Sequence, residues 1–131
     1  MKFILFVSLC LVLGIMSFQI ENEKEESIKR GEDVYIFYCQ KCHMADGKGG
    51  ENLYPPVAGS DYLFNNIDQS IQILMLGSNK DILVNGKTHD MDMEPSYLSD
   101  KEIADVMNYI LNSWENTYDG TITEDQVASL R

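Results

Sequence analysis

Two stretches of the chain carry apolar residues at the spacing of one helix face. The first is formed by Ile67, Ile71, Leu74 and Met75. The second, longer stripe is formed by Ile103, Val106, Met107, Ile110 and Leu111. Since apolar residues repeat every three or four positions in both, each stretch is expected to form an amphipathic helix with one buried side.

Capping residues place the ends of these two helices. Gly77 follows the first stripe and is suited to a helix C-terminus. Ser99 precedes the second stripe, and Glu102 stands three positions later, which is the pattern of a capping box. The second helix is therefore expected to begin at Ser99 and to run to about Trp114.

Three weaker helical patterns complete the helical content. From about Ser27 to His43, one face presents Gly31, Tyr35 and Cys39 at every fourth position. Ser60 is suited to cap a short helical turn from about residue 61. Residues 123–126 carry a Thr and a Gln at capping spacing, which indicates a last short helix before the C-terminus.

Turn-forming residues separate these helices. Three glycines within residues 47–50 indicate a flexible loop, and Pro55-Pro56 stiffens the segment that follows. Asn85-Gly86 within residues 82–88 predicts a small hairpin. Residues 89–95 have no periodicity and are expected to form a loop. The pattern as a whole predicts an all-α domain of about four to five short helices with one small hairpin.

The N-terminal region differs in composition from the rest. Lys2 is followed by an uncharged, mainly apolar run over residues 3–18, which is typical of a signal peptide or an N-terminal membrane anchor. Lipidation of Cys10 is not expected, because Leu9 stands where a small residue is needed. Residues 19–28 are acidic and are expected to form a solvated linker. Residues 29–131 are then expected to form the folded domain.

The charge of the chain narrows the classes of partner. It has 21 acidic and 10 basic side chains, so its formal net charge is −11. Nucleic-acid binding is disfavoured, because contacts with phosphates need a basic surface. An acidic protein would instead be steered towards partners that carry basic docking patches.

The run Cys39-Gln40-Lys41-Cys42-His43 carries the clearest chemistry. The C-x-x-C-H order is typical of c-type haem attachment, in which both thiols form thioether bonds to haem and His binds its iron. A zinc site would need more ligands than His43 and His89 supply. A thioredoxin-like redox pair would lie in a βαβ pattern, which is not found here.

Together these motifs resemble the class I c-type cytochromes, in particular the small bacterial mono-haem domains. The resemblance extends from about Gly31 to Arg131. It includes a Gly-x-x-x-Tyr-x-x-x-C-x-x-C-H helix, the segment Pro55-Pro56-Val57-Ala58-Gly59 and the helix Leu-Ser-Asp-Lys-Glu-Ile-Ala that begins at Leu98. It implies a cytochrome c fold around one covalently attached haem c. It also implies that the first helix crosses the helix that begins at Ser99, and that Gly31 packs against Tyr109 at this crossing.

The resemblance implies the remaining iron ligand and its support. The family usually supplies a Met that is followed directly by Pro, whereas this chain has Met91-Asp92-Met93-Glu94-Pro95. Met93 is the expected sixth ligand, because it stands five residues before Leu98 as in related chains. Met91 and His89 remain alternatives. The backbone carbonyl of Pro55 is expected to accept a hydrogen bond from the His43 ring.

The expected function is that of an exported mono-haem cytochrome c, located in the periplasm or otherwise outside the cytoplasm. It would transfer single electrons between redox proteins of a respiratory or dehydrogenase chain and would not itself be an enzyme. Cys39 and Cys42 would hold the haem, with His43 and Met93 on its iron. The alternative is a haem enzyme or sensor whose sixth iron position is labile.

Overall fold

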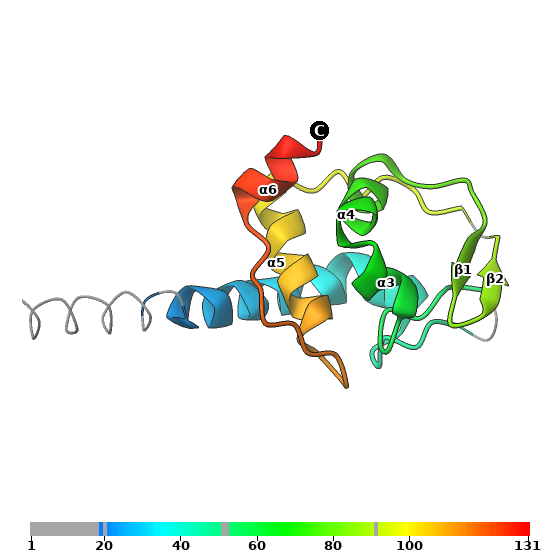
Figure 1. Ribbon diagram of the computed structural model, residues 1–131, viewed down its shortest axis with the longest axis horizontal. Coiled ribbons are helices and arrows are strands. Elements are labelled where there is room, and N and C mark those ends of the chain that lie inside the picture. The colour runs from blue at the N-terminus through cyan, green and yellow to red at the C-terminus, as the bar shows by residue number, and fades with distance from the viewer. Residues whose placement is uncertain (1–18, 20, 51–52, 91) are drawn as a thin grey trace, which may run out of the picture.

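The chain folds as a set of helices with one small hairpin at one side, and the sequence predicts these elements (Figure 1). The computed structural model describes residues 19, 21–50, 53–90 and 92–131. Residues 21–34 are α-helical and continue into the elements η1, a π-helix, and α2. The elements in chain order are η1 (Tyr35–Cys39), α2 (Gln40–His43), α3 (Asp61–Asn65), α4 (Ile67–Leu76), β1 (Ile82–Val84), β2 (Lys87–His89), α5 (Asp100–Leu111) and α6 (Glu124–Ser129).

The first helix crosses α5 at Gly31. A Cβ atom on this residue would clash with the carbonyl of Asp105 and lie 2.8 Å from the Cβ of Tyr109. The predicted packing of Gly31 against Tyr109 is therefore confirmed. Beside the crossing, the ring centroid of Tyr35 lies 5.4 Å from that of Tyr109 and 5.3 Å from that of Trp114. These contacts fix the first helix at close range on α5.

The helix begins earlier than the sequence pattern indicates. Residues 21–28 are helical, whereas a solvated linker was expected there. Ser27 is buried and its hydroxyl donates to the Asp105 carboxylate over 2.6 Å. Lys24 donates to the backbone carbonyl of Tyr118, also over 2.6 Å. Because these contacts are polar, the hydrophobic pattern gave no sign of them.

Within the described residues, no helix has both the length and the apolar character needed to cross a membrane.

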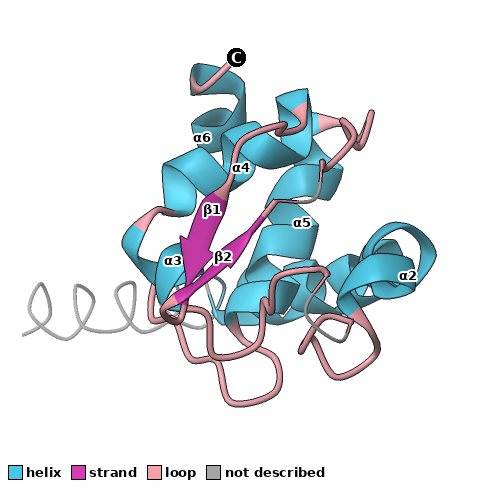
Figure 2. Ribbon diagram, turned by 90° about the vertical axis from the view of Figure 1, so that its right-hand side faces the viewer, coloured by secondary structure: helices cyan, strands magenta, loops and turns pink. Residues whose placement is uncertain are grey.

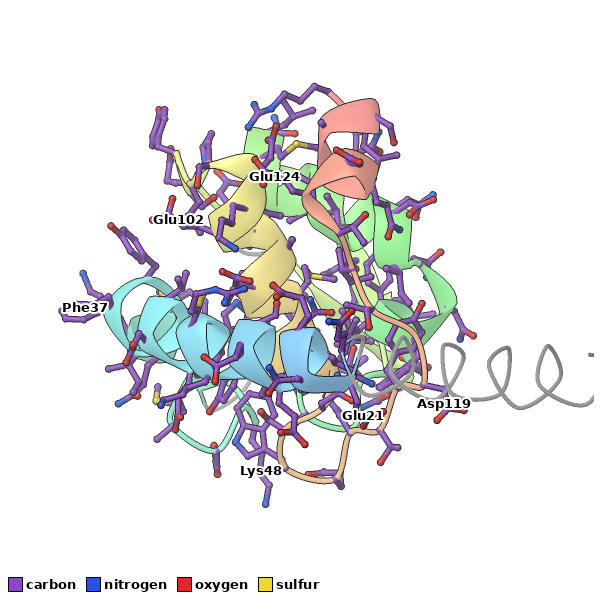
Figure 3. The ribbon with its side chains drawn as sticks, turned by 90° about the vertical axis from the view of Figure 1, so that its left-hand side faces the viewer. Glu21, Phe37, Lys48, Glu102, Asp119 and Glu124 are labelled. Atoms are coloured by element: carbon purple, nitrogen blue, oxygen red, sulfur yellow. The ribbon has the colours of Figure 1, made fainter. Side chains whose placement is uncertain are left out.

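Within η1, the backbone hydrogen bonds of the first helix span five residues instead of the four of an α-helix. The backbone N–H of Gln40 donates to the carbonyl of Tyr35, which is an i to i+5 bond of the π-helical kind. Tyr35 and Cys39 at its two ends are buried. Between them, Ile36, Phe37 and Tyr38 face solvent, and Phe37 is 82% exposed (Figure 3). An unbroken α-helix was expected over this stretch.

The capping predictions for the middle helices are confirmed. The Ser60 hydroxyl accepts a hydrogen bond of 3.2 Å from the backbone N–H of Leu63 at the start of α3. Gly77 ends α4 with a φ of 74°, a left-handed conformation that glycine adopts without strain. The buried side of α4 is formed by Ile71, Leu74 and Met75.

The hairpin is also confirmed, but it is longer than the sequence indicated. Antiparallel β1 and β2 pair Ile82 with His89 and Val84 with Lys87, and β1 lies beside α3 (Figure 2). His89 was expected in the loop that follows, as an exposed residue. It belongs to β2 instead, and only 4% of its surface is exposed.

The last two helices begin where their caps were predicted. Both bonds of the capping box between Ser99 and Glu102 are present at the start of α5. α5 ends at Leu111, three residues before the expected Trp114, which has a positive φ of 56°. This turn allows the Trp114 ring to pack on Tyr35. α6 begins with a bond from the backbone N–H of Gln126 to the Thr123 hydroxyl.

Candidate functional site

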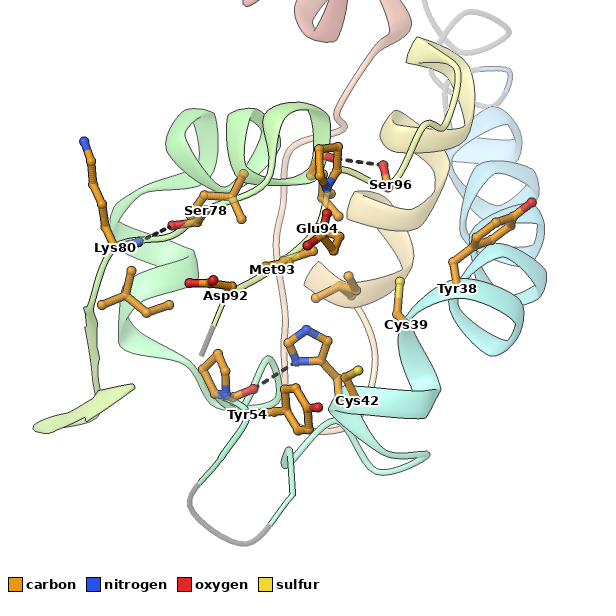
Figure 4. Close-up of a pocket in the computed structure, with 17 residues that line it drawn as sticks. Tyr38, Cys39, Cys42, Tyr54, Ser78, Lys80, Asp92, Met93, Glu94 and Ser96 are labelled. Atoms are coloured by element: carbon orange, nitrogen blue, oxygen red, sulfur yellow. Dashed lines mark hydrogen bonds between the residues drawn. The ribbon is translucent and has the colours of Figure 1, made fainter. Parts of the chain in front are cut away.

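One cavity of the described structure has a volume of about 450 Å³, which is in the range of small-molecule and cofactor sites. Its wall is mainly apolar, and a few polar groups converge on it (Figure 4). The lining residues come from the first helix, the loop at residues 54–55, the end of α4, β1, the loop before α5 and α5 itself. Its apolar lining includes Ile73, Leu74, Ile82 and Ile110.

Cys39 and Cys42 line one wall of this cavity as free thiols. Cys39 ends η1 and Cys42 lies in α2, so the π-helical turn sets how the two thiols face the cavity. Burial, and to a lesser degree the neighbouring Cys42, raise the pKa of Cys39 to about 11. Both predicted attachment residues are thus brought to one cavity, and Cys39 is held as a neutral thiol at neutral pH.

The ring of His43 projects into the same cavity and is oriented by a backbone group. Its Nδ1–H donates to the Pro55 carbonyl oxygen over 2.9 Å (Figure 4). Burial lowers the pKa of His43, although the bond to Pro55 opposes this effect. The neutral imidazole therefore has its proton on Nδ1, and the lone pair of Nε2 is available to a metal. The contact expected for Pro55 is present.

Met93 lines the cavity from the loop before α5 and packs against the core. Its backbone exchanges two hydrogen bonds of 2.8 Å with Ser78, directly after α4. Ser96 adds bonds from its hydroxyl and its backbone N–H to the Leu74 carbonyl, of 2.7 and 3.0 Å. The loop is therefore fastened at Met93 itself and three residues later at Ser96, which positions this side chain at the cavity. Met91, the alternative ligand, lies outside the described residues.

Gly77 makes this attachment of the loop sterically feasible. A Cβ atom there would stand 2.9 Å from the Cδ of Pro95, so any side chain would push the loop away from α4. The close approach and the positive φ both require glycine at this position. A residue that the sequence suggested only as a helix end thus also shapes the cavity.

His89, the third candidate ligand, lies in a different place. It contributes to a second, smaller cavity between the hairpin and the residues Lys48, Tyr54 and Pro56, and it is not among the residues that line the first cavity. Tyr54 lines both cavities, and a hydrogen bond with Cys42 raises its pKa. Sequence analysis did not identify Tyr54, although its place directly before Pro55 was a usable signal.

The cavity fits a covalently attached haem better than a bare metal ion. It combines an apolar wall, two free thiols, one imidazole with a free Nε2 and one thioether. In the described part of the chain, no group of three or more His, Cys, Asp or Glu side chains is arranged to hold a metal ion. The donor set instead resembles that of haem iron in cytochromes c, which is bound by His and Met.

Comparison with known proteins gives a consistent result. The family model described as Cytochrome c matches residues 28–114. The chain is 30% identical over 103 residues to the cytochrome c subunit of a quinone-dependent alcohol dehydrogenase from Gluconobacter oxydans, covering 77% of this chain. It is 33% identical over 113 residues to the cytochrome c subunit of gluconate 2-dehydrogenase from Pantoea cypripedii, covering 82% of this chain.

The length of the matched region differs between relatives. The chain spans about a fifth to a quarter of those dehydrogenase subunits, 22% and 25% respectively. Cytochrome c-552 of Thermus thermophilus is 33% identical over 89 residues, which cover 64% of this chain and 67% of that protein. The similarity therefore concerns one domain of the larger subunits and most of the smaller protein.

Proposed function

The chain belongs to the cytochrome c family, whose members bind haem c covalently, and we propose that it carries single electrons between redox proteins. One observation carries this proposal more than any other. Cys39, Cys42, His43 and Met93 line the same apolar cavity, although Met93 is distant from the others in sequence. These residues suit covalent attachment and two-sided ligation of one haem.

In this proposal the two thiols fix the cofactor. Each Cys would add across a vinyl group, so that the sulfur would bond to one carbon and the thiol hydrogen would move to the other. No oxidant or reductant would be consumed by this addition. Cys39 is buried and Cys42 is partly buried, so both bonds would form at the wall of the cavity. The two bonds would hold the cofactor in one orientation relative to the first helix.

His43 and Met93 then determine how the site behaves. When bound, the haem supplies one iron that exchanges a single electron between its ferrous and ferric states. His43 would bind this iron through Nε2 while Pro55 holds the proton on Nδ1. The Met93 thioether, a soft ligand, would favour the ferrous state. With both positions taken, there is no site for a substrate, which is why we propose a carrier and not an enzyme.

The partners and location follow as parts of the same proposal. Two of the relatives named above are cytochrome subunits of dehydrogenases, so a dehydrogenase or another respiratory protein is the proposed partner. The net charge of −11 favours partners with basic docking patches. Residues 1–18 are proposed to direct export or to anchor the protein in a membrane, with the haem domain outside the cytoplasm.

Haem attachment and electron transfer can be tested on one preparation. The chain is produced with a c-type maturation system, denatured and examined by mass spectrometry. We expect the mass of the polypeptide plus one haem, and a reversible one-electron wave in voltammetry of the native protein. Cys39→Ala and Cys42→Ala should each leave at most one thioether bond. Loss of all haem on denaturation of the wild-type protein would contradict the proposal.

A separate assay addresses the alternative of a labile sixth position. Cyanide and carbon monoxide are added to the ferric and ferrous protein, respectively, and the absorption spectrum is followed. A carrier with both iron positions occupied should bind neither readily at neutral pH. Rapid binding of either would favour the haem enzyme or sensor instead.

A further inference from the structure

The second cavity has a polar character that the proposed function does not use. Its volume is about 250 Å³, and its lining combines cationic and hydrogen-bonding side chains. The lining residues are Lys48, Tyr54, Pro56, Val84, Asn85, Lys87 and His89. Tyr54 also lines the first cavity, and Pro55, which lines the first, is directly followed by Pro56, which lines the second. The two cavities therefore adjoin along residues 54–56.

His89, which lines this cavity, has a ring nitrogen without a hydrogen-bond partner among the described residues. Only 4% of its surface is exposed, and its Nδ1 is buried with no hydrogen-bond partner among the described residues. A buried polar atom without a hydrogen-bond partner is energetically unfavourable. Such an atom in a cavity indicates that a group from outside the polypeptide completes it.

The register of the hairpin connects this group with the first cavity. Ile82 lines the first cavity and is directly opposite His89 across β1 and β2. Residues directly opposite in an antiparallel pair project from the same face of the sheet. Val84 and Lys87 form the next pair on that face, and both line the second cavity. Side chains on one face of the hairpin thus line both the apolar cavity and the polar one.

The chemistry of the polar cavity suits a carboxylate. Lys48 and Lys87 place two cations at it in a chain that has only 10 basic side chains against 21 acidic ones. Tyr54 and His89 can each donate a hydrogen bond, and donors of this kind bind carboxylate oxygens. Asn85 contributes less, because its side chain already bonds to the Asp61 N–H and the Gly59 carbonyl.

We propose that this cavity receives a carboxylate, and that in the loaded protein the carboxylate is a propionate of the haem, which accepts a hydrogen bond from Nδ1 of His89. The inference rests on the proposed function, because haem carries both an apolar ring and carboxylate groups. The ring would occupy the first cavity, and one carboxylate would reach past Tyr54 into the second. His89 is then a positioning residue for the cofactor and not an iron ligand.

The test begins with the wild-type protein, so that it does not depend on a variant that folds. The haem-loaded protein is labelled with ¹⁵N-histidine, and the Nδ1 resonance of His89 is compared in the loaded and the haem-free chain. A crystal structure of the loaded protein shows whether a haem carboxylate oxygen lies within hydrogen-bond distance of this atom. We expect a hydrogen-bonded Nδ1 in the loaded protein and a carboxylate contact in the crystal.

Variants then test the donor itself. His89→Phe keeps a ring in the buried position but removes the donor, whereas His89→Asn restores a donor near the place of Nδ1. Thr88→Val is the matched control, since Thr88 lies in the same strand and is exposed. The propionate bending band in the resonance Raman spectrum should shift in His89→Phe, return in His89→Asn and stay unchanged in Thr88→Val. An unchanged band in His89→Phe would overturn the proposal.

Two further outcomes separate the sources of the carboxylate and the two proposals. Sodium acetate is titrated into the loaded protein. A saturable shift of the His89 resonance would indicate a site for a free anion and would overturn the assignment to haem. A haemochrome assay measures covalent haem independently of His89. Attached haem with an unpartnered His89 would overturn this inference alone, whereas absence of attached haem from the wild-type protein would overturn both.

Discussion

Gly31 and Tyr109 approach so closely that a Cβ atom on Gly31 would lie 2.8 Å from the Tyr109 Cβ. Such a distance is below normal van der Waals contact, so the first helix and α5 can cross here only because one partner is glycine. The crossing brings η1 against α5, and Ile110 of α5 lines the same cavity as both thiols and His43. The closeness of two helices thus contributes to the shape of this cavity.

Gly31→Ala should destabilise the protein. Alanine favours a helix over glycine by about 1 kcal/mol, so a helix without this contact would become more stable. Here the added methyl group meets the Asp105 carbonyl, and overpacking of this kind costs about 1–3 kcal/mol. Urea unfolding of the haem-loaded protein should show a lower free energy of unfolding. The exposed neighbour Glu32 provides the control, since Glu32→Ala should change it by less than about 0.5 kcal/mol. Equal stability of Gly31→Ala and wild type would refute the packing argument.

Tyr35→Phe tests the support of the loop that follows the C-x-x-C-H motif. The Tyr35 hydroxyl donates a 2.7 Å hydrogen bond to the Met44 carbonyl, directly after His43. Removal of the hydroxyl leaves this carbonyl without that donor. The free energy of unfolding, measured by thermal unfolding, should therefore fall by about 1 kcal/mol. Tyr97 is 90% exposed and is the matched control. A loss of stability in Tyr97→Phe as large as that in Tyr35→Phe would show that the buried bond has no particular role.

Asp105 should make the stability of the protein depend on pH. Burial alone would raise the pKa of this carboxyl, but hydrogen bonds from Arg30 and Ser27 outweigh it and lower the pKa below its ordinary value of about 3.8. The Arg30 guanidinium donates over 2.8 and 2.9 Å. In the folded state the charged form is therefore favoured, and near pH 4 the unfolded state binds more protons. The resulting stabilisation is fully present above the ordinary pKa and is lost as the pH falls through the folded-state pKa.

The Asp105→Asn variant isolates this effect. At pH 7 it should lower the free energy of unfolding by about 2 kcal/mol, since hydrogen bonds to charged groups contribute about 1.5–3 kcal/mol. The difference from wild type should shrink as the pH is lowered below about 4. Urea unfolding at several pH values measures both quantities. A difference that stays constant from pH 7 to pH 3 would rule out the charged contact as its cause.

The apolar periodicity of the sequence was sufficient for most of the fold. The stripes on α4 and α5 are spaced for helices, and their caps at Gly77 and Ser99 are local signals, so both helices could be predicted. The first turns of the first helix could not be predicted in this way, because Lys24 and Ser27 contact the rest of the protein through hydrogen bonds. The π-helical turn between Tyr35 and Cys39 has no counterpart in the local apolar pattern.

The candidate site was predictable to a similar degree. Cys39, Cys42 and His43 form one local motif, and the structure brings them to the cavity together with Met93. His89 was wrongly predicted to lie in a loop. A polar side chain directly after a short hairpin gives no sign that the strand includes it and that it is buried. Its burial depends on the pairing with Ile82, which is a property of the folded hairpin.

The central claim, a haem iron closed by His43 and Met93, is tested most directly by the Met–iron charge-transfer band of the ferric protein. We predict that the wild-type protein has this band and that Met93→Ala abolishes it, lowers the reduction potential and allows cyanide to bind. Met91→Ala is the matched control and should leave all three properties nearly unchanged. Loss of the band in Met91→Ala with no effect of Met93→Ala would move the ligand by two residues. A wild-type protein without the band would contradict the account of a closed electron carrier.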